Sequence, residues 1–154
     1  MELSRNLMIE SVARLGPTAP RSVRAGGVVA EAVAVLREGG VGCLLVTEAG
    51  RLVGVFTERD LLTRVLAAGL SLETPLRRVM TPDPVSVGLH EPIRQAIRRM
   101  QLGGYRHLPV IDAEDRPVGI LSAKRVIRYI AEHFPHVVYN LPPGRGSPEA
   151  REGA

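Results

Sequence analysis

Two short stretches of the chain place a hydroxyl group and charged side chains in the same frame. GVFTERD occupies residues 54–60 and GILSAKR occupies residues 119–125. Thr57 stands between an apolar stretch and the helical pattern ERDLLTRVL. Its hydroxyl and the Asp60 carboxylate three positions later are therefore typical of a helix capping box. A carboxylate in this place is also able to accept hydrogen bonds from two sugar hydroxyls, and both interpretations stay open on these residues alone.

The second stretch keeps the hydroxyl, as Ser122, but carries Lys124 and Arg125 in the first turn of the expected helix. Cations there oppose the helix dipole by roughly 0.3–1 kcal/mol at exposed sites. Free N–H groups, a hydroxyl and cations together are what an anionic phosphate binds. Arg106 and His107, which follow a Gly-Gly turn, add to this set. We therefore expect the first stretch to bind a sugar and the second stretch to bind a phosphate.

Both stretches belong to an internal repeat that extends over most of the chain. Residues 28–46 align with 92–110 at an offset of 64, and residues 51–66 align with 116–131 at an offset of 65. The apolar positions agree, and each copy predicts a strand, a helix, a strand, a turn, a strand and a second helix. Such a β-α-β-β-α unit leaves one sheet face uncovered. The sequence thus predicts an α/β (α+β) protein of two units packed face to face with pseudo-two-fold symmetry.

The same alignment divides the chain into segments. Turn-forming, Pro-containing sequence separates the copies. We expect a helix over residues 3–15, and a C-terminal segment that is extended or disordered because YNLPPGRGSPEAREGA has little to bury. The predicted segments are an N-terminal helix and linker (1–15), a first repeat (16–70), a connector (71–79), a second repeat (80–137) and a Pro/Gly-rich tail (138–154).

Composition narrows the cellular setting and the class of partner. The chain has 154 residues, one cysteine, a formal net charge of +4 and a pI of about 10.0. A single cysteine excludes an internal disulfide framework and fits a reducing compartment. No apolar run approaches the roughly 20 residues that span a bilayer, so we expect a cytoplasmic protein without a membrane partner. The modest positive charge is weak evidence for nucleic acid, because any phosphate ligand suits it equally.

With both copies in register, the chain resembles a tandem pair of CBS domains, named after cystathionine β-synthase and called a Bateman module. The resemblance covers about residues 8–135 and rests on the two stretches above, on LPVID and TPDPVSV, and on the two hairpins. It implies an adenine nucleotide or related adenosyl ligand, such as AMP, ADP, ATP or S-adenosylmethionine, in the clefts between the repeats. It also implies a stand-alone CBS protein that forms a homodimer, a flat disc of four repeats.

The resemblance further implies roles for individual residues. In the family the motif hydroxyl contacts phosphate and the motif acid holds ribose, and these positions are Thr57 and Asp60 here. The base is commonly held by backbone and apolar contacts from the first and middle strands. The positions that this implies, with Val55 just before Thr57, are Ala19, Arg21, Val41, Gly42 and Cys43 in copy one, and Asp83, Val85, Tyr105 and Arg106 in copy two.

The second copy resembles the regulatory γ subunit of AMP-activated kinase, where basic residues at the positions of Arg106, His107 and Lys124 reach the phosphates. Ser122 keeps the motif hydroxyl. Arg125 stands where an acid would hold ribose, which leaves two expectations open: the second nucleotide site is empty, or Arg125 serves the first site.

We expect a regulatory module that senses an adenosyl ligand and signals to an effector protein by a change of shape. Two other classes stay open. A structural or dimerisation module without ligand predicts no ligand response, and a nucleic-acid-binding protein predicts an affinity that falls steeply with salt. Because no catalytic constellation occurs in the sequence, we expect no catalytic residue, no metal site and no enzymatic activity.

Overall fold

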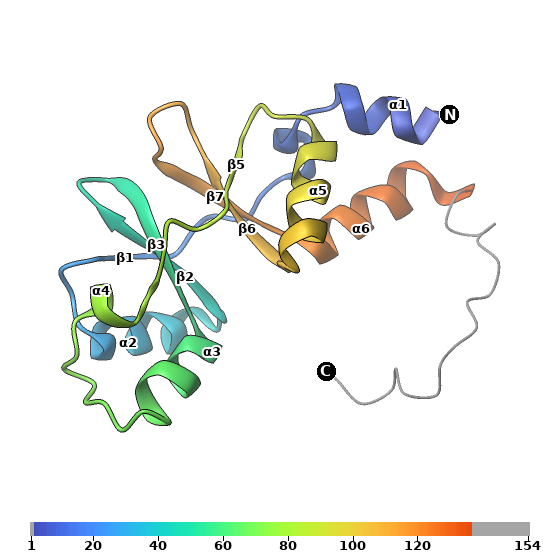
Figure 1. Ribbon diagram of the computed structural model, residues 1–154. Coiled ribbons are helices and arrows are strands. Elements are labelled where there is room, and N and C mark those ends of the chain that lie inside the picture. Colours follow the sequence, from blue (N-terminus) through green and yellow to red (C-terminus); the bar gives the residue numbers. More distant parts are fainter. Residues whose placement is uncertain (1, 137–154) are drawn as a thin grey trace, which may run out of the picture.

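The computed structural model describes residues 2–136, and its first repeat follows the predicted order of elements (Figure 1). Helix α3 continues directly into a π-helical turn, η2, so that one helical segment follows the hairpin. The elements are β1 (Ser22–Arg24), α2 (Val29–Gly39), β2 (Cys43–Glu48), β3 (Arg51–Thr57), α3 (Glu58–Asp60) and η2 (Leu61–Leu66).

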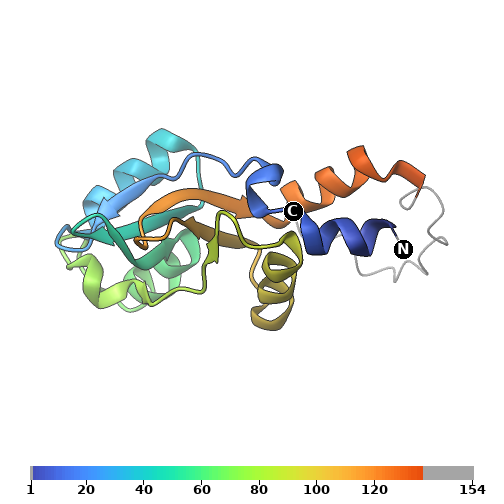
Figure 2. The same cartoon turned by 90° about the horizontal axis from the view of Figure 1, so that it is seen from above.

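The second repeat has the same order: β5 (Val87–Gly88), α5 (Ile93–Gly103), β6 (His107–Ile111), β7 (Pro117–Ser122) and α6 (Ala123–His133). Helix α1 and helix α6 lie at the same end of the molecule (Figure 2). Short elements precede each repeat, and we call residues 12–18 and 76–82 the lead-in segments. The elements before the repeats are α1 (Glu2–Ile9) and the 3₁₀ turn η1 (Val12–Leu15), and then α4 (Leu76–Val79) and β4 (Thr81–Pro82).

The first helix of each repeat forms and ends for the same local reasons. In α2 the apolar residues Val29, Ala32 and Leu36 recur at helical spacing and are buried. The helix ends at Gly40, whose φ of 58° is in the left-handed region that glycine adopts most easily. Helix α5 ends in the same way at Gly104, with a φ of 66°.

The two sheets exchange edge segments between the repeats. The first sheet has the order β1-β2-β3-β4 and the second has the order β5-β6-β7. Strand β4, which leads into the second repeat, pairs antiparallel with β3 of the first and sets Val55 opposite Thr81. Thr18 makes the matching bridge to β7: its N–H donates to the Ile120 carbonyl at 3.0 Å, and its carbonyl accepts from the Ile120 N–H at 2.9 Å. Each hairpin is therefore extended by the lead-in segment of the other repeat.

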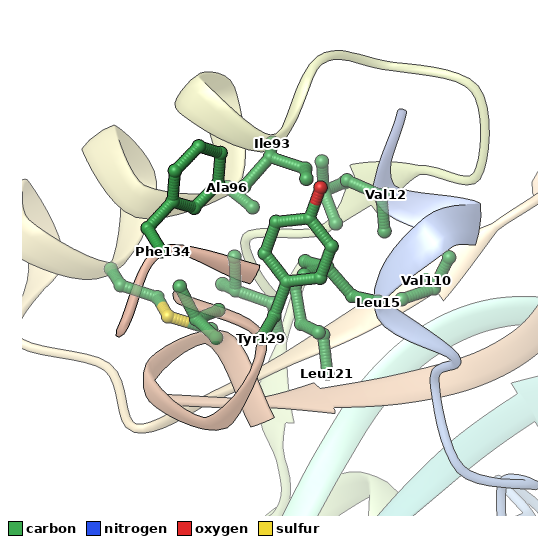
Figure 3. Close-up of a cluster of buried hydrophobic side chains, with 12 residues drawn as sticks. Val12, Leu15, Ile93, Ala96, Val110, Leu121, Tyr129 and Phe134 are labelled. Atoms are coloured by element: carbon green, nitrogen blue, oxygen red, sulfur yellow. The ribbon is translucent and has the colours of Figure 1, made fainter. Parts of the chain in front are cut away.

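Two separate hydrophobic cores show the same exchange. Val12 and Leu15 of η1 are buried in the core of the second repeat, against Tyr129 of α6 (Figure 3). Leu76 and Val79 of α4 are buried in the core of the first repeat. Each repeat thus encloses apolar side chains that belong, by chain order, to the other repeat.

The predicted fold class is confirmed, since two β-α-β-β-α units pack together with a pseudo-two-fold relation. The single helix expected over 3–15 is wrong. Helix α1 ends at Ile9, because the Val12 N–H donates to the Glu91 carbonyl and the Ala13 N–H donates to the Leu89 carbonyl, each at 2.9 Å.

The segment expected as a connector, 71–79, contains helix α4, whose Leu76 and Val79 are buried, as well as turns. Because this segment has no long apolar pattern, its contribution to a hydrophobic core was not predicted from the sequence. The tail expected over 138–154 lies outside the described residues. Among residues 2–136, no helix is both long enough and apolar enough to cross a membrane.

The exchange predicts that the lead-in segments carry much of the stability. Leu76 is fully buried, so we expect Leu76→Ala to lower the free energy of unfolding by about 2–5 kcal/mol. Leu72, four residues earlier and 42% exposed, provides the control, and Leu72→Ala should stay within about 0.5 kcal/mol of the wild type. Urea unfolding followed by circular dichroism measures both, and equal losses would contradict a buried role for α4.

Candidate functional site

The larger of two clefts between the repeats lies beside Thr57, and we call it the Thr57 cleft. Its volume is about 650 Å³. One side is formed by the facing ends of β2 and β3 with Glu58 and Arg59, and the other by residues 81–85 and 104–107. The cleft therefore combines the first repeat's motif with the second repeat's lead-in segment and middle strand.

The smaller cleft lies beside Ser122, and we call it the Ser122 cleft. It has a volume of about 330 Å³. Thr18, Ala19 and Arg21 line it from the first lead-in segment and the residues that follow, and residues 40–43 line it from the turn after α2. Both volumes fall in the range of about 300–1,000 Å³ that is common for small-molecule sites.

A common wall separates the two clefts. Gly42, Cys43, His107 and Ile120 line both of them. Cys43 lies opposite Thr57 in the first hairpin, and His107 lies opposite Ser122 in the second. The two clefts are therefore equivalent by the internal repeat, but one has a thiol and the other an imidazole beside its motif hydroxyl.

Most of the predicted site residues line one cleft or the other. Asp60, Lys124 and Arg125 line neither. The Thr57 cleft contains Val55, Thr57, Asp83, Val85, Tyr105 and Arg106 together with the shared Gly42, Cys43 and His107. The Ser122 cleft contains Ala19, Arg21, Val41 and Ser122 with the same shared three.

Each cleft combines positions of both copies. Ala19, Arg21 and Val41 of copy one line the cleft beside Ser122 of copy two. Asp83 and Val85 of copy two line the cleft beside Thr57 of copy one. The reason is the exchange of lead-in segments, which carries the residues before each first strand across to the other hairpin.

Thr57 and Asp60 form the predicted capping box. The Asp60 N–H donates to Thr57 Oγ1 at 3.1 Å, and the Thr57 N–H donates to Asp60 Oδ2 at 3.0 Å. Asp60 Oδ1 lies 3.5 Å from Arg64 Nε. Because the Thr57 oxygen acts as an acceptor in the cap, its O–H hydrogen remains available to a ligand. The capping interpretation is confirmed, and it leaves the hydroxyl able to bind a ligand as well.

The charge of Asp60 also reaches the cleft wall. Burial, followed by the negative charge of Asp60, raises the pKa of the Cys43 thiol from 9.0 to about 11. Cys43 is consequently a neutral thiol at physiological pH, and Asp60 lies near the cleft although its side chain does not line it.

Positive charge gathers around His107. His107 is solvent-exposed overall. Partial burial of the imidazole nevertheless lowers the pKa of His107, and the positive charges of Arg106 and then Lys124 lower this pKa further. Within residues 2–136, neither Arg106 nor Lys124 has a carboxylate in ion-pair distance, in contrast to Arg77 and Arg99. Unpaired cations of this kind favour an anionic ligand.

Several lining residues were missed by the sequence reasoning. Glu58 and Arg59 line the Thr57 cleft, and Thr18 and Ile120 line the Ser122 cleft. A signal was available for Glu58 and Arg59, since they directly follow the motif hydroxyl. None existed for Thr18, whose role depends on its bridge to a strand 102 positions away. No group of three or more His, Cys, Asp or Glu side chains suited to a metal ion occurs among the described residues.

Comparison with protein families gives a match over both repeats. The model of the CBS domain matches residues 7–67 and again residues 76–132. Meiotically up-regulated gene 70 protein of Schizosaccharomyces pombe is 41% identical over 95 residues, which are 61% of this chain and 13% of that protein. An uncharacterized 17.7 kDa protein of Acidianus ambivalens is 29% identical over 126 residues, 81% of this chain and 76% of that protein. The chain thus spans most of the second relative and only a small part of the first.

Solved structures give the same family. The CBS domain protein PAE2072 from Pyrobaculum aerophilum, complexed with AMP, superposes with a TM-score of 0.69 at 26% identity, over 84% of this chain and 97% of its own. CBSX2 in complex with AMP superposes with a TM-score of 0.66, also at 26% identity, over 79% of this chain and 96% of its own.

The lowered pKa of His107 predicts a pH dependence of stability. The unfolded chain takes up the proton at an ordinary pKa of 6.5, above that of the folded chain. The contribution of neutral His107 to the free energy of unfolding is therefore complete above pH 6.5, and it is lost as the pH falls below 6.5. We expect His107→Asn to lose less stability than the wild type between about pH 7.5 and 5.5. Thermal unfolding at both pH values measures this, and equal losses in the two proteins would contradict it.

Proposed function

Because the chain belongs to the CBS domain family, we propose that it is a regulatory module whose Thr57 cleft binds an adenine nucleotide or a related adenosyl ligand. The observation that carries this proposal is the composition of the cleft. Thr57 from one repeat and Arg106 from the other line a single cavity of about 650 Å³. The AMP complexes of the two similar proteins support the choice of ligand class.

The lining residues suit the parts of a nucleotide. Val55, Val85 and Tyr105 offer apolar surface for the base. The Thr57 O–H hydrogen, together with the guanidinium of Arg106, which has no carboxylate in ion-pair distance among residues 2–136, suits phosphate oxygens. On the family resemblance we assign the ribose hydroxyls to Asp60, which lies beside the cleft without lining it. Within residues 2–136 its Oδ1 has the 3.5 Å contact with Arg64 Nε and retains capacity to accept hydrogen bonds.

Signalling would follow from the position of the cleft. A ligand that contacts both repeats favours the relative arrangement in which both sets of contacts form, and it changes the shape only if the two arrangements differ in ligand affinity. We propose that an effector protein reads this difference. We further propose that the module has no catalytic role and acts in the cytoplasm, where a single reduced cysteine is stable.

The nucleotide proposal predicts a specific loss on substitution of Arg106. We expect AMP to bind the wild type, and Arg106→Ala to weaken the affinity about tenfold or more because a charge-assisted contact to phosphate is lost. Arg106 is exposed, so the variant should keep the wild-type melting temperature. Calorimetric titration of each protein with AMP, ADP, ATP and S-adenosylmethionine measures the change and selects the ligand.

Arg37→Ala is the matched control, because Arg37 is an exposed residue of α2 outside both clefts. Its AMP affinity should equal that of the wild type. Binding of none of the four ligands would refute the nucleotide proposal and favour a module with a structural role. An affinity for RNA or DNA that falls steeply with salt would favour the nucleic-acid alternative.

We also propose that the chain forms a homodimer through its second helices. Leu62 of η2 and Ile127 of α6 occupy equivalent positions in the two repeats, and they are 59% and 66% exposed. Exposed apolar side chains repeated by internal symmetry suit a two-fold interface, in which the same surface is used by both copies.

The dimer proposal predicts that a double substitution separates the subunits. We expect the wild type to sediment as a dimer, and Leu62→Glu with Ile127→Glu to sediment as a monomer, because charge in an apolar interface is costly to desolvate. Met8→Glu, which changes an exposed apolar residue of α1, should leave the dimer intact. Sedimentation equilibrium tests all three, and a monomeric wild type at tens of micromolar would rule the interface out.

A further inference from the structure

The Ser122 cleft differs from the Thr57 cleft in the charges that line it. Arg21 and His107 line the Ser122 cleft, and no aspartate or glutamate among the described residues does. Glu58 and Asp83 line the Thr57 cleft. Arg21 has no carboxylate in ion-pair distance within residues 2–136. The positive charge of the Ser122 cleft is therefore not neutralised by the part of the chain that the structure describes.

The motif beside this cleft lacks the acid that completes the cap in the first repeat. There, Asp60 Oδ2 accepts the Thr57 N–H at 3.0 Å. In the second repeat Arg125 holds the equivalent position, and its N–H donates to Ser122 Oγ at 3.1 Å. Because that bond uses the Ser122 oxygen as an acceptor, the O–H hydrogen can donate to a ligand. An oxyanion beside Ser122 would supply the negative charge that the Asp60 carboxylate supplies beside Thr57.

One cation, Arg21, lines this cleft, and a second, Lys124, lies near its wall. The Arg21 side chain crosses the end of α2, where its Cδ and Nε would lie 2.5 Å from a Cβ atom at Gly39. The absence of a side chain at Gly39 thus leaves the room that the Arg21 side chain occupies. Lys124 is close enough to His107 to contribute to the lowering of its pKa. Arg21 therefore lines the cleft, and Lys124 lies near His107 of the cleft wall without lining the cleft itself.

Its size also sets the Ser122 cleft apart. The volume of about 330 Å³ is half that of the Thr57 cleft and near the lower limit for small-molecule sites. We propose that the Ser122 cleft binds a compact phosphate-type anion, not a second nucleoside, through Arg21, His107 and the Ser122 hydroxyl. This site is additional to the nucleotide site proposed at Thr57 and does not depend on it.

The test is a calorimetric titration of the full chain with pyrophosphate, alone and with saturating AMP. We expect one Arg21-dependent pyrophosphate site per chain in both conditions. Arg21→Ala should weaken pyrophosphate binding about tenfold or more, because a charge-assisted contact is lost. Arg37→Ala removes the same charge from an exposed position of α2 outside the clefts, and it should leave the pyrophosphate affinity unchanged.

Three results would overturn the proposal: pyrophosphate does not bind, AMP displaces it, or Arg21→Ala and Arg37→Ala weaken it equally. A failure of AMP to bind would refute only the nucleotide function, because the titration with pyrophosphate alone still reports on the Ser122 cleft. A third titration in the presence of ATP separates two sources of the anion. If ATP blocks pyrophosphate where AMP does not, the phosphate tail of a nucleotide is the occupant; if ATP has no effect, a free anion is.

A second variant tests the missing carboxylate directly. Arg125→Asp restores an acid three residues after the motif hydroxyl, which completes a capping box and should preserve folding. We expect it to weaken pyrophosphate binding about tenfold or more, through loss of positive charge and repulsion of the anion. AMP binding at the Thr57 cleft should be unchanged. An unaltered pyrophosphate affinity in Arg125→Asp would contradict the assignment of the anion to this cleft.

Discussion

The exchange of lead-in segments between the repeats is the constraint on which the rest of the structure depends. Leu76 and Val79 fill the core of the first repeat, and Val12 and Leu15 fill that of the second. Neither repeat encloses a complete core from its own contiguous sequence. Cooperative folding of the pair follows, because unfolding one repeat exposes apolar side chains of the segment that leads into the other.

The same exchange builds the clefts. The backbone pairing of Thr18 with Ile120 fixes the first lead-in segment beside Ser122, and the pairing of Thr81 with Val55 fixes the second beside Thr57. Each cleft is thereby bounded by both repeats, and a small ligand in either one would contact two units. In this architecture the backbone hydrogen bonds that stabilise the fold also place the side chains that line the clefts.

The elements were predictable from sequence because their signals are local. The spacing of Val29, Ala32 and Leu36 predicts α2, and the hydroxyl and acid of TERD predict the cap that the structure contains. The pairing partners of the lead-in segments were not predictable. A strand as short as Thr81–Pro82 has too few residues for a hydrophobic pattern that specifies the strand with which it pairs. The residue types of the candidate site were therefore foreseen more completely than their grouping. Individual motifs identified Thr57 and Arg106, whereas only the three-dimensional exchange put them in one cavity.

The first repeat has an acid, Asp60, at the position where the second repeat has Arg125. The geometry of the clefts determines what this difference does. In two isolated repeats it would alter only a helix cap. Here the altered cap borders a cleft whose wall, Cys43 and His107, is shared with the other cleft. An anion beside Ser122 would favour protonated His107 and oppose the effect of Arg106 and Lys124 on its pKa. Since the same imidazole lines the Thr57 cleft, the two proposed sites share a titratable group, and any effect of one occupant on the affinity of the other would be reciprocal. On this proposal, divergence at one position gives two equivalent clefts different ligand preferences.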